Sequence, residues 1–175
     1  MRASAAVPRL LLAGALCAVA AVASAEVVVV PLRSFEEVPS VSSTAKGAFV
    51  AFINDRQGSI RYELRYDALQ GDVRQAHIHF GQRGVNGGVS VFLCQTAANP
   101  DPTGLAPTCA PAPARVTGTL TAANVIGPAG QGIAAGEFAE LVRAIRAGAA
   151  YVNVHSSTFP AGEVRGQTHH GWSQP

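Results

Sequence analysis

Charge is scarce and balanced in this sequence. The 175 residues include 13 Lys and Arg against 11 Asp and Glu, and Lys46 is the single lysine. Arg2 and Arg9 lie in an N-terminal segment that we expect to be removed, which leaves 11 basic residues against 11 acidic ones. Because no basic stripe remains, the sequence lacks the electrostatic footprint of a nucleic-acid-binding protein. We therefore expect no nucleic-acid partner.

Long hydrophobic runs are absent except at the N-terminus, where residues 10–22 are almost wholly apolar. Arg2 and Arg9 precede this run, and the small-x-small triplet Ala23-Ser24-Ala25 follows it, which is the pattern of a secretory signal peptide. The run is too short and too rich in alanine to favour a spanning helix, although an uncleaved anchor is the alternative. We expect residues 1–25 to be cleaved, leaving a secreted or periplasmic protein without a membrane span.

Cysteine is also rare, with three residues in all. Cys17 lies in the expected signal peptide, so the mature chain keeps only Cys94 and Cys109. An even pair of cysteines in an exported protein indicates a disulfide bond. The segment between them, residues 95–108, is rich in Pro, Ala and Thr and is typical of a surface loop. Two free thiols that serve a metal or redox site are the alternative.

The sequence lacks a recognisable catalytic arrangement. Paired carboxylates, a Ser-His-Asp order and a reactive cysteine are not identifiable. Ser156, Ser157 and Thr158 follow His155, but such a run indicates a turn rather than a nucleophile. The glycine-dense residues 81–88 resemble a phosphate-binding loop only in glycine count, because no helix follows them. An enzyme is therefore disfavoured.

Short stretches with strand character make up most of the mature chain. They lie at residues 26–32, 46–53, 59–67, 73–80, 89–94, 115–121, 151–155 and 163–167. Residues 59–67 alternate apolar and polar side chains, which predicts one core face and one solvent face. The four valines in residues 26–32 instead predict a strand that is buried on both faces or covered at an edge.

Only one segment has the period of an amphipathic helix. In residues 137–147 the apolar side chains recur at intervals of three and four, with acidic residues in the first turn and arginines in the last. Many short strands with turns between them, plus a single short helix, predict a mainly β domain. We expect an antiparallel β-sandwich or barrel.

Three histidines lie on two of the predicted strands. Side chains alternate between the faces of a strand, so His77 and His79 share one face while Ile78 points to the other. By the same rule Asn153 and His155 share a face of the later strand. If the two strands are neighbours, the three imidazoles converge outside a Val/Ile core. Whether they are neighbours is not settled by the pattern.

Four ordered motifs carry a family resemblance. They are Glu37-Val38-Pro39 with Ala45-x-Gly47, Ala76-His77-Ile78-His79-x-Gly81 with Gly84-x-Asn86-Gly87, Gly148-x-x-Tyr151-Val152-Asn153-Val154-His155, and Pro160-x-Gly162-Glu163-Val164-Arg165-Gly166-Gln167. Together they resemble the CHRD domain, named after repeats in chordin, over residues 26–168. The sequence departs from the pattern at Glu36, where many members carry Asn, and in a tail over residues 169–175 that includes His169 and His170 and that we expect to be flexible.

The resemblance implies an immunoglobulin-like β fold and an exported protein. It implies no catalytic residues, and the role of chordin outside cells does not transfer to a single domain. The first hypothesis is therefore a non-catalytic extracytoplasmic binding or structural module, with an unidentified protein or surface as its partner.

The alternative hypothesis is a copper or zinc protein, with possible redox activity. A His-x-His pair on a strand plus a distant third histidine suits both metals, and Cu/Zn superoxide dismutases carry such a pair on an analogous fold. In this interpretation His77, His79 and His155 are the ligands, and Glu37 or Glu163 is an extra ligand or a second-layer acceptor.

The same polar face has a purely structural interpretation. His77, His79, Asn153, Glu163 and Arg165 would then form a hydrogen-bonded network that fixes the order of the strands. In that case Glu163 and Arg165 would form an ordinary ion pair, which stabilises a protein little when it is exposed.

Overall fold

The computed structural model describes residues 26–168, which form eight strands and one α-helix. The predicted signal peptide and the tail with His169 and His170 lie outside the described residues. The strands are β1 (Glu26–Arg33), β2 (Lys46–Asn54), β3 (Ser59–Asp67), β4 (Val73–Phe80), β5 (Gly88–Cys94), β6 (Ala114–Leu120), β7 (Ala150–Ser156) and β8 (Val164–Gln167). The short 3₁₀ helices η1 (Ser34–Glu36), η2 (Ala122–Asn124) and η3 (Ala129–Gln131) lie in the connections.

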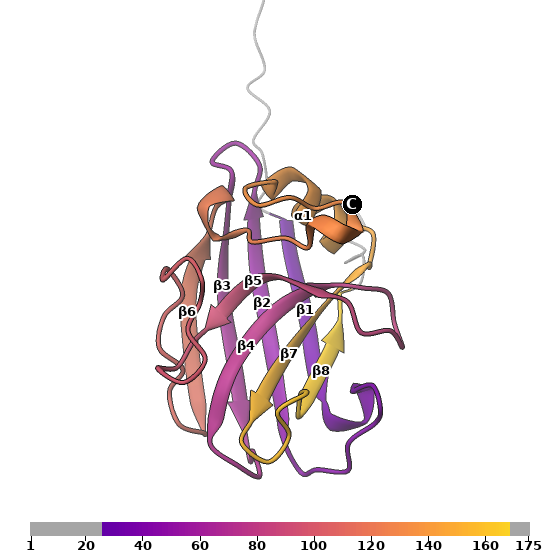
Figure 1. Ribbon diagram of the computed structural model, residues 1–175, viewed down its shortest axis with the longest axis vertical. Helices are drawn as coiled ribbons and strands as arrows, with labels where there is room; N and C mark the ends of the chain where they lie inside the picture. Colours follow the sequence, from indigo (N-terminus) through magenta and orange to yellow (C-terminus); the bar gives the residue numbers. More distant parts are fainter. Residues whose placement is uncertain (1–25, 169–175) are drawn as a thin grey trace, which may run out of the picture.

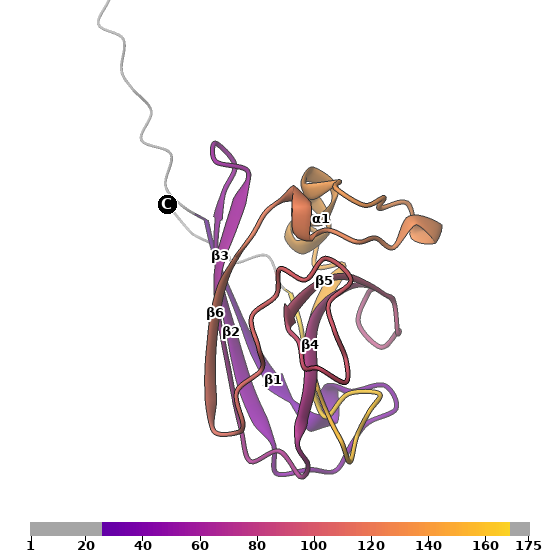
Figure 2. The same ribbon diagram turned by 60° about the vertical axis from the view of Figure 1, so that its left-hand side comes forward.

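All eight strands belong to one antiparallel sheet with the order β5-β4-β7-β8-β1-β2-β3-β6. The sheet curls so that β1, β2, β3 and β6 form one wall and β4 and β5 face them from the other (Figures 1 and 2). A hydrogen bond of 2.6 Å from the Tyr62 hydroxyl on β3 to the Leu93 carbonyl on β5 joins the two walls. The predicted antiparallel sandwich or barrel is confirmed as a nearly closed barrel.

The interior of the barrel follows the alternation in the sequence. On β3 the side chains of Ile60, Tyr62, Leu64 and Tyr66 are all buried, and the residues between them point outward. The other wall contributes Ile78 from β4 and valines from β7 and β8 to the same core. Apolar burial of this kind supplies the main stabilising term, roughly 25 cal/mol per Å² of apolar surface.

The first strand corrects one expectation. Val28 and Val30 are buried in the core, but Val27 and Val29 are 44% and 61% exposed. The run of four valines is therefore not buried on both faces. The reason is geometric, because alternate side chains of a barrel strand point outward and the outer surface of the β1–β2 wall is not covered by the helix or the connecting loops (Figure 2).

The predicted helix is confirmed as α1 (Phe138–Arg146), which covers one end of the barrel (Figure 1). Its buried stripe includes Leu141, Val142 and Ile145. Arg146 in the last turn pairs with Glu26 at 2.7 Å and with Asp55 at 2.8 Å, which ties the helix to β1 and to the β2–β3 hairpin. Within residues 26–168, the structure contains no helix with the length and apolar character required to cross a membrane.

The predicted disulfide between Cys94 and Cys109 is present, with both residues buried. It closes a loop that also folds around the buried Asp101, whose carboxylate accepts hydrogen bonds from the backbone N–H groups of Thr103, Leu105 and Ala106. The segment after Cys109 is also tied to the facing wall, because the Tyr66 hydroxyl on β3 donates a hydrogen bond to the Ala110 carbonyl.

Removal of the disulfide should destabilise the protein. The bond closes a loop with a sequence separation of 15, for which the chain-entropy model gives about 3 kcal/mol. We expect a Cys94→Ser/Cys109→Ser double variant to lose about this much free energy of unfolding in urea titrations. The wild type measured with a reductant serves as the control and should match the variant. An unchanged urea midpoint in both would contradict the prediction.

Candidate metal centre

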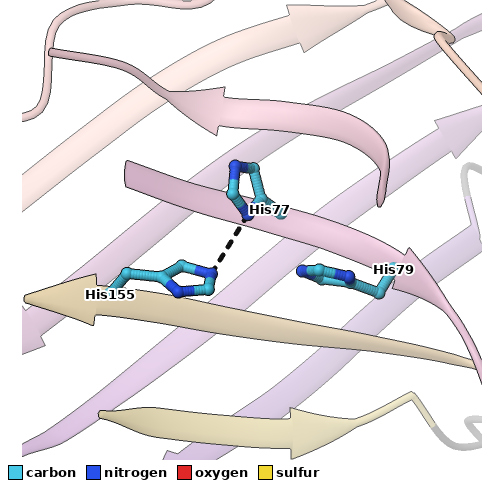
Figure 3. A group of neighbouring side chains, drawn as sticks. All are labelled: His77, His79 and His155. Carbon is cyan, nitrogen blue, oxygen red and sulfur yellow. Dashed lines mark hydrogen bonds between the residues drawn. The ribbon is translucent and has the colours of Figure 1, made fainter. Parts of the chain in front are cut away.

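The strand order brings the three histidines together. β4 and β7 are neighbours, and their register pairs His77 with Asn153 and His79 with Tyr151, while His155 lies opposite Gln75. The imidazoles project from the face of the sheet opposite Ile78 and the core valines (Figure 3). One ligand atom from each histidine lies within 4.8 Å of the others. The adjacency that the sequence pattern left open is thus a feature of the fold.

This three-histidine group, His77, His79 and His155, is buried although it lies outside the barrel core. The exposed fractions of the three residues are 2%, 7% and 6% in that order. Phe92 on β5 packs its ring edge-to-face against His77, with the ring centres 4.3 Å apart. On the other side, the Tyr151 ring stacks on His79 with the centres 4.7 Å apart.

Two of the imidazoles are held by backbone carbonyls. His79 Nδ1 lies 2.9 Å from the Gly87 oxygen, and His155 Nδ1 lies 3.0 Å from the Pro160 oxygen. A carbonyl oxygen only accepts hydrogen bonds, so each Nδ1 carries the proton and each Nε2 keeps a free lone pair. Histidines that bind metals are held in this way, with the second ring nitrogen donating to a carbonyl or carboxylate.

His77 completes the group. Its Nδ1 lies 3.1 Å from His155 Nε2, while its own Nε2 and that of His79 are buried without a hydrogen-bond partner. Two nitrogens that bind one ion at about 2.0–2.1 Å in tetrahedral geometry are about 3.3 Å apart. The observed spacing therefore fits either a His–His hydrogen bond or two ligands of the same ion.

Burial keeps all three histidines neutral near pH 7. It lowers the pKa of His77 to about 2, with the neighbouring His155 and His79 adding to the effect. It lowers the pKa of His79 to about 4, partly offset by the hydrogen bond to Gly87, and it also lowers the pKa of His155. Neutral imidazole is the form that binds metal ions, so no proton has to be displaced from a cationic ring.

The two predicted acidic partners lie outside this group. The three-histidine group is the set of His, Cys, Asp and Glu side chains within residues 26–168 that could hold an ion, and neither Glu37 nor Glu163 belongs to it. Glu163 is fully buried and accepts hydrogen bonds from Ser43 Oγ at 2.7 Å and from the Gln70 N–H at 2.8 Å. It thus ties two loops to the start of β8.

Glu37 is buried beside Asn153, and one of its oxygens has no hydrogen-bond partner. Burial raises the pKa of Glu37 to about 7, against the opposing effects of the Arg165 charge and the Asn153 hydrogen bond. The Asn153 side chain also partly offsets the effect of burial that lowers the pKa of His79, so Asn153 lies between the Glu37 carboxyl group and the three-histidine group. Gly162 has a φ of 135°, which other residues rarely adopt, and a β-carbon at this position would lie 2.5 Å from Glu37 Oε1.

Arg165 holds the loop that covers the site. The side chain is 2% exposed and donates to the Asn86 side-chain oxygen at 3.0 Å and to the Val85 carbonyl at 2.8 Å. Its guanidinium lies 3.4 Å from the centre of the Tyr151 ring. Arg165 and Glu163 therefore have separate partners, in contrast to the ion pair of the structural interpretation.

Several contacts of the site were not predicted from the sequence. They are the carbonyls of Gly87 and Pro160 and the ring of Phe92. The motifs Gly84-x-Asn86-Gly87 and Pro160-x-Gly162 were visible, but a backbone carbonyl leaves no signal in a sequence. Phe92 reads as an ordinary apolar strand residue, and only its register opposite His77 gives it a role.

Buried neutral histidines predict sensitivity to acid. The folded pKa values lie below the ordinary 6.5, so the unfolded chain binds protons that the folded chain does not, and the free energy of unfolding falls as the pH drops below about 6.5. With a chelator present, we expect a loss of more than about 1 kcal/mol per pH unit between about pH 6 and 5 in urea titrations. Equal stability at both pH values would contradict this.

Glu37 changes the pH dependence of the free energy of unfolding in the direction opposite to that of the histidines. Its folded pKa of about 7 lies above the ordinary 4.5, so its contribution to stability is lost as the pH rises through 7 and regained as it falls. This contribution offsets part of the loss from the histidines. The Glu37→Gln variant should therefore show a steeper acid destabilisation than the wild type, and an identical or shallower slope would refute the assignment.

The comparisons with known proteins give one match. The family model of the CHRD domain matches residues 28–168, which is essentially the whole described chain. No curated protein and no solved structure matches the chain. Because the family model covers far more than half of the sequence, and the quoted motifs fall within the match, the chain belongs to the CHRD domain family.

Proposed function

We propose that this protein is a non-catalytic extracytoplasmic metal-binding module in which His77, His79 and His155 hold one copper or zinc ion. The observation that carries the proposal is the pair of carbonyl-anchored imidazoles, His79 and His155, whose lone pairs are left on Nε2 beside His77. Neutral imidazole nitrogen is a suitable ligand for both metals.

The surrounding residues support the role of a binding site. Gly87 and Pro160 fix two ring orientations before an ion arrives, so little side-chain entropy is lost on binding. Phe92 and Tyr151 pack against the rings and exclude water from them. The buried Nε2 atom of His79 has no partner, which is costly in a metal-free structural network and would be relieved by an ion.

An extracytoplasmic location is part of the proposal. The Cys94–Cys109 disulfide supports an oxidising compartment, and the predicted signal peptide supports export. A protein or surface partner remains a prediction of the sequence and of the family resemblance.

A metal-free structural network is the second candidate. It is favoured by the distance of 3.1 Å between His77 Nδ1 and His155 Nε2, because a hydrogen bond there satisfies both atoms without an ion. The two candidates differ in one measurable property, which is whether the folded protein takes up metal.

Metal analysis of the untagged protein tests the proposal. We expect about one equivalent of copper or zinc per chain after incubation at micromolar metal and desalting, and close to none in the His79→Ala variant. The matched control is a His169→Ala/His170→Ala variant, which changes the two other histidines of the chain and should bind as the wild type does.

Thermal unfolding of the wild type tests metal binding without any substitution, so the result does not depend on whether the variants fold. Metal at about 100 times the dissociation constant should stabilise the folded state by about 2.7 kcal/mol and raise the melting temperature. A protein that takes up no metal and shows no shift would establish the structural network instead.

A further inference from the structure

The donors of the three-histidine group carry no negative charge. An imidazole that binds a metal ion is neutral, and neither Glu37 nor Glu163 belongs to the group. β7 lies between β4 and β8, and the Asn153 side chain on β7 has an oxygen, Oδ1, without a hydrogen-bond partner. This amide oxygen is also neutral. A divalent ion bound here would therefore keep its full charge of two, and a monovalent ion its charge of one.

The environment of the group raises the cost of that charge. The three histidines are 2–7% exposed, and the aromatic rings of Phe92 and Tyr151 pack against two of them. The free energy needed to bring an ion from water into such a low-dielectric region grows with the square of its charge. For ions of equal size a divalent ion therefore needs about four times as much as a monovalent one.

Arg165 adds a positive charge close to the group. β4 and β8 lie on opposite sides of β7, so the Tyr151 ring lies between the imidazole of His79 and the guanidinium of Arg165. This charge repels a divalent ion twice as strongly as a monovalent one. Glu37 also lies in this region, beside Asn153, and is not one of the donors.

The number of donors points the same way. Zn(II) is almost always four-coordinate in proteins, with anionic ligands or water completing the set. Cu(I) has a filled d shell and accepts three ligands in a trigonal arrangement. Three converging imidazole nitrogens beneath a covering loop match the second requirement more closely than the first.

We propose that the three-histidine group selects monovalent copper, Cu(I), over divalent ions such as Zn(II) and Cu(II). This inference rests on the proposed function and names the ion that the site takes. The selection follows from neutral donors, a buried setting and the nearby guanidinium of Arg165.

Competition titrations test the inference on the full-length mature protein. Cu(I) is titrated without oxygen against a coloured Cu(I) chelator, and Zn(II) and Cu(II) are titrated against coloured chelators for divalent ions. We expect the dissociation constant for Cu(I) to be at least 100-fold lower than that for either divalent ion. Equal or tighter binding of a divalent ion would overturn the inference and leave the proposed function standing, whereas no binding of any ion would overturn both.

One substitution tests the cause of the selectivity. Asn153→Asp adds a negative charge beside His79 with almost no change in volume, so it should lower the ratio of Cu(I) to Zn(II) affinity at least tenfold. The control is Asn54→Asp in the β2–β3 hairpin, where the side-chain oxygen accepts a hydrogen bond from the Gln57 N–H and an aspartate can do the same.

The control should leave the affinity ratio of the wild type unchanged. A ratio that does not change in a folded Asn153→Asp variant would contradict the charge argument. If that variant does not fold, the affinities of the wild-type protein for the three ions still decide between the outcomes.

Discussion

The pairing of β4 with β7 is the constraint on which the rest of the site depends. Their register places Ile78 and Val152 side by side in the barrel core, and the same alternation places His77 and His79 on the outer face beside Asn153. A slip of one residue would send the histidines into the core and the apolar residues outward. The packing of the barrel therefore positions the polar group as strictly as it positions the core.

The outer face of a barrel is normally exposed to solvent, but here loops bury the part that carries the histidines. Arg165 binds the carbonyl of Val85 and the side chain of Asn86, which holds residues 81–87 over the imidazoles. Glu163 anchors two other loops to the start of β8 through Ser43 and Gln70. Both side chains thus act mainly as loop anchors, and the loop that Arg165 holds helps to bury the histidines.

Charge is distributed sparingly around the group. Burial neutralises the histidines and raises the pKa of Glu37, and Arg165 remains the main formal charge that faces them. Buried polar groups without partners are uncommon in folded proteins and call for an explanation. An ion held by His79 Nε2, His155 Nε2 and His77 Nδ1 would give the unpartnered Nε2 of His79 a partner, whereas the Nε2 of His77 would keep none.

The sequence by itself determined the local features of this protein. The positions of the strands to within about one residue, the single helix, the disulfide and the common face of His77 and His79 follow from periodicity, composition and cysteine count, because these depend on near neighbours in the chain. It failed for the outer face of the first strand, since a run of valines does not reveal which side meets the core.

Only the tertiary structure decided the rest. The adjacency of His155 to the His-x-His pair, the carbonyl partners at Gly87 and Pro160, and the separation of Glu163 from the group depend on strand order and loop packing between residues up to 120 positions apart. Such contacts are set by the closure of the whole barrel. A local pattern can show which face a histidine occupies, but not which strand lies beside it.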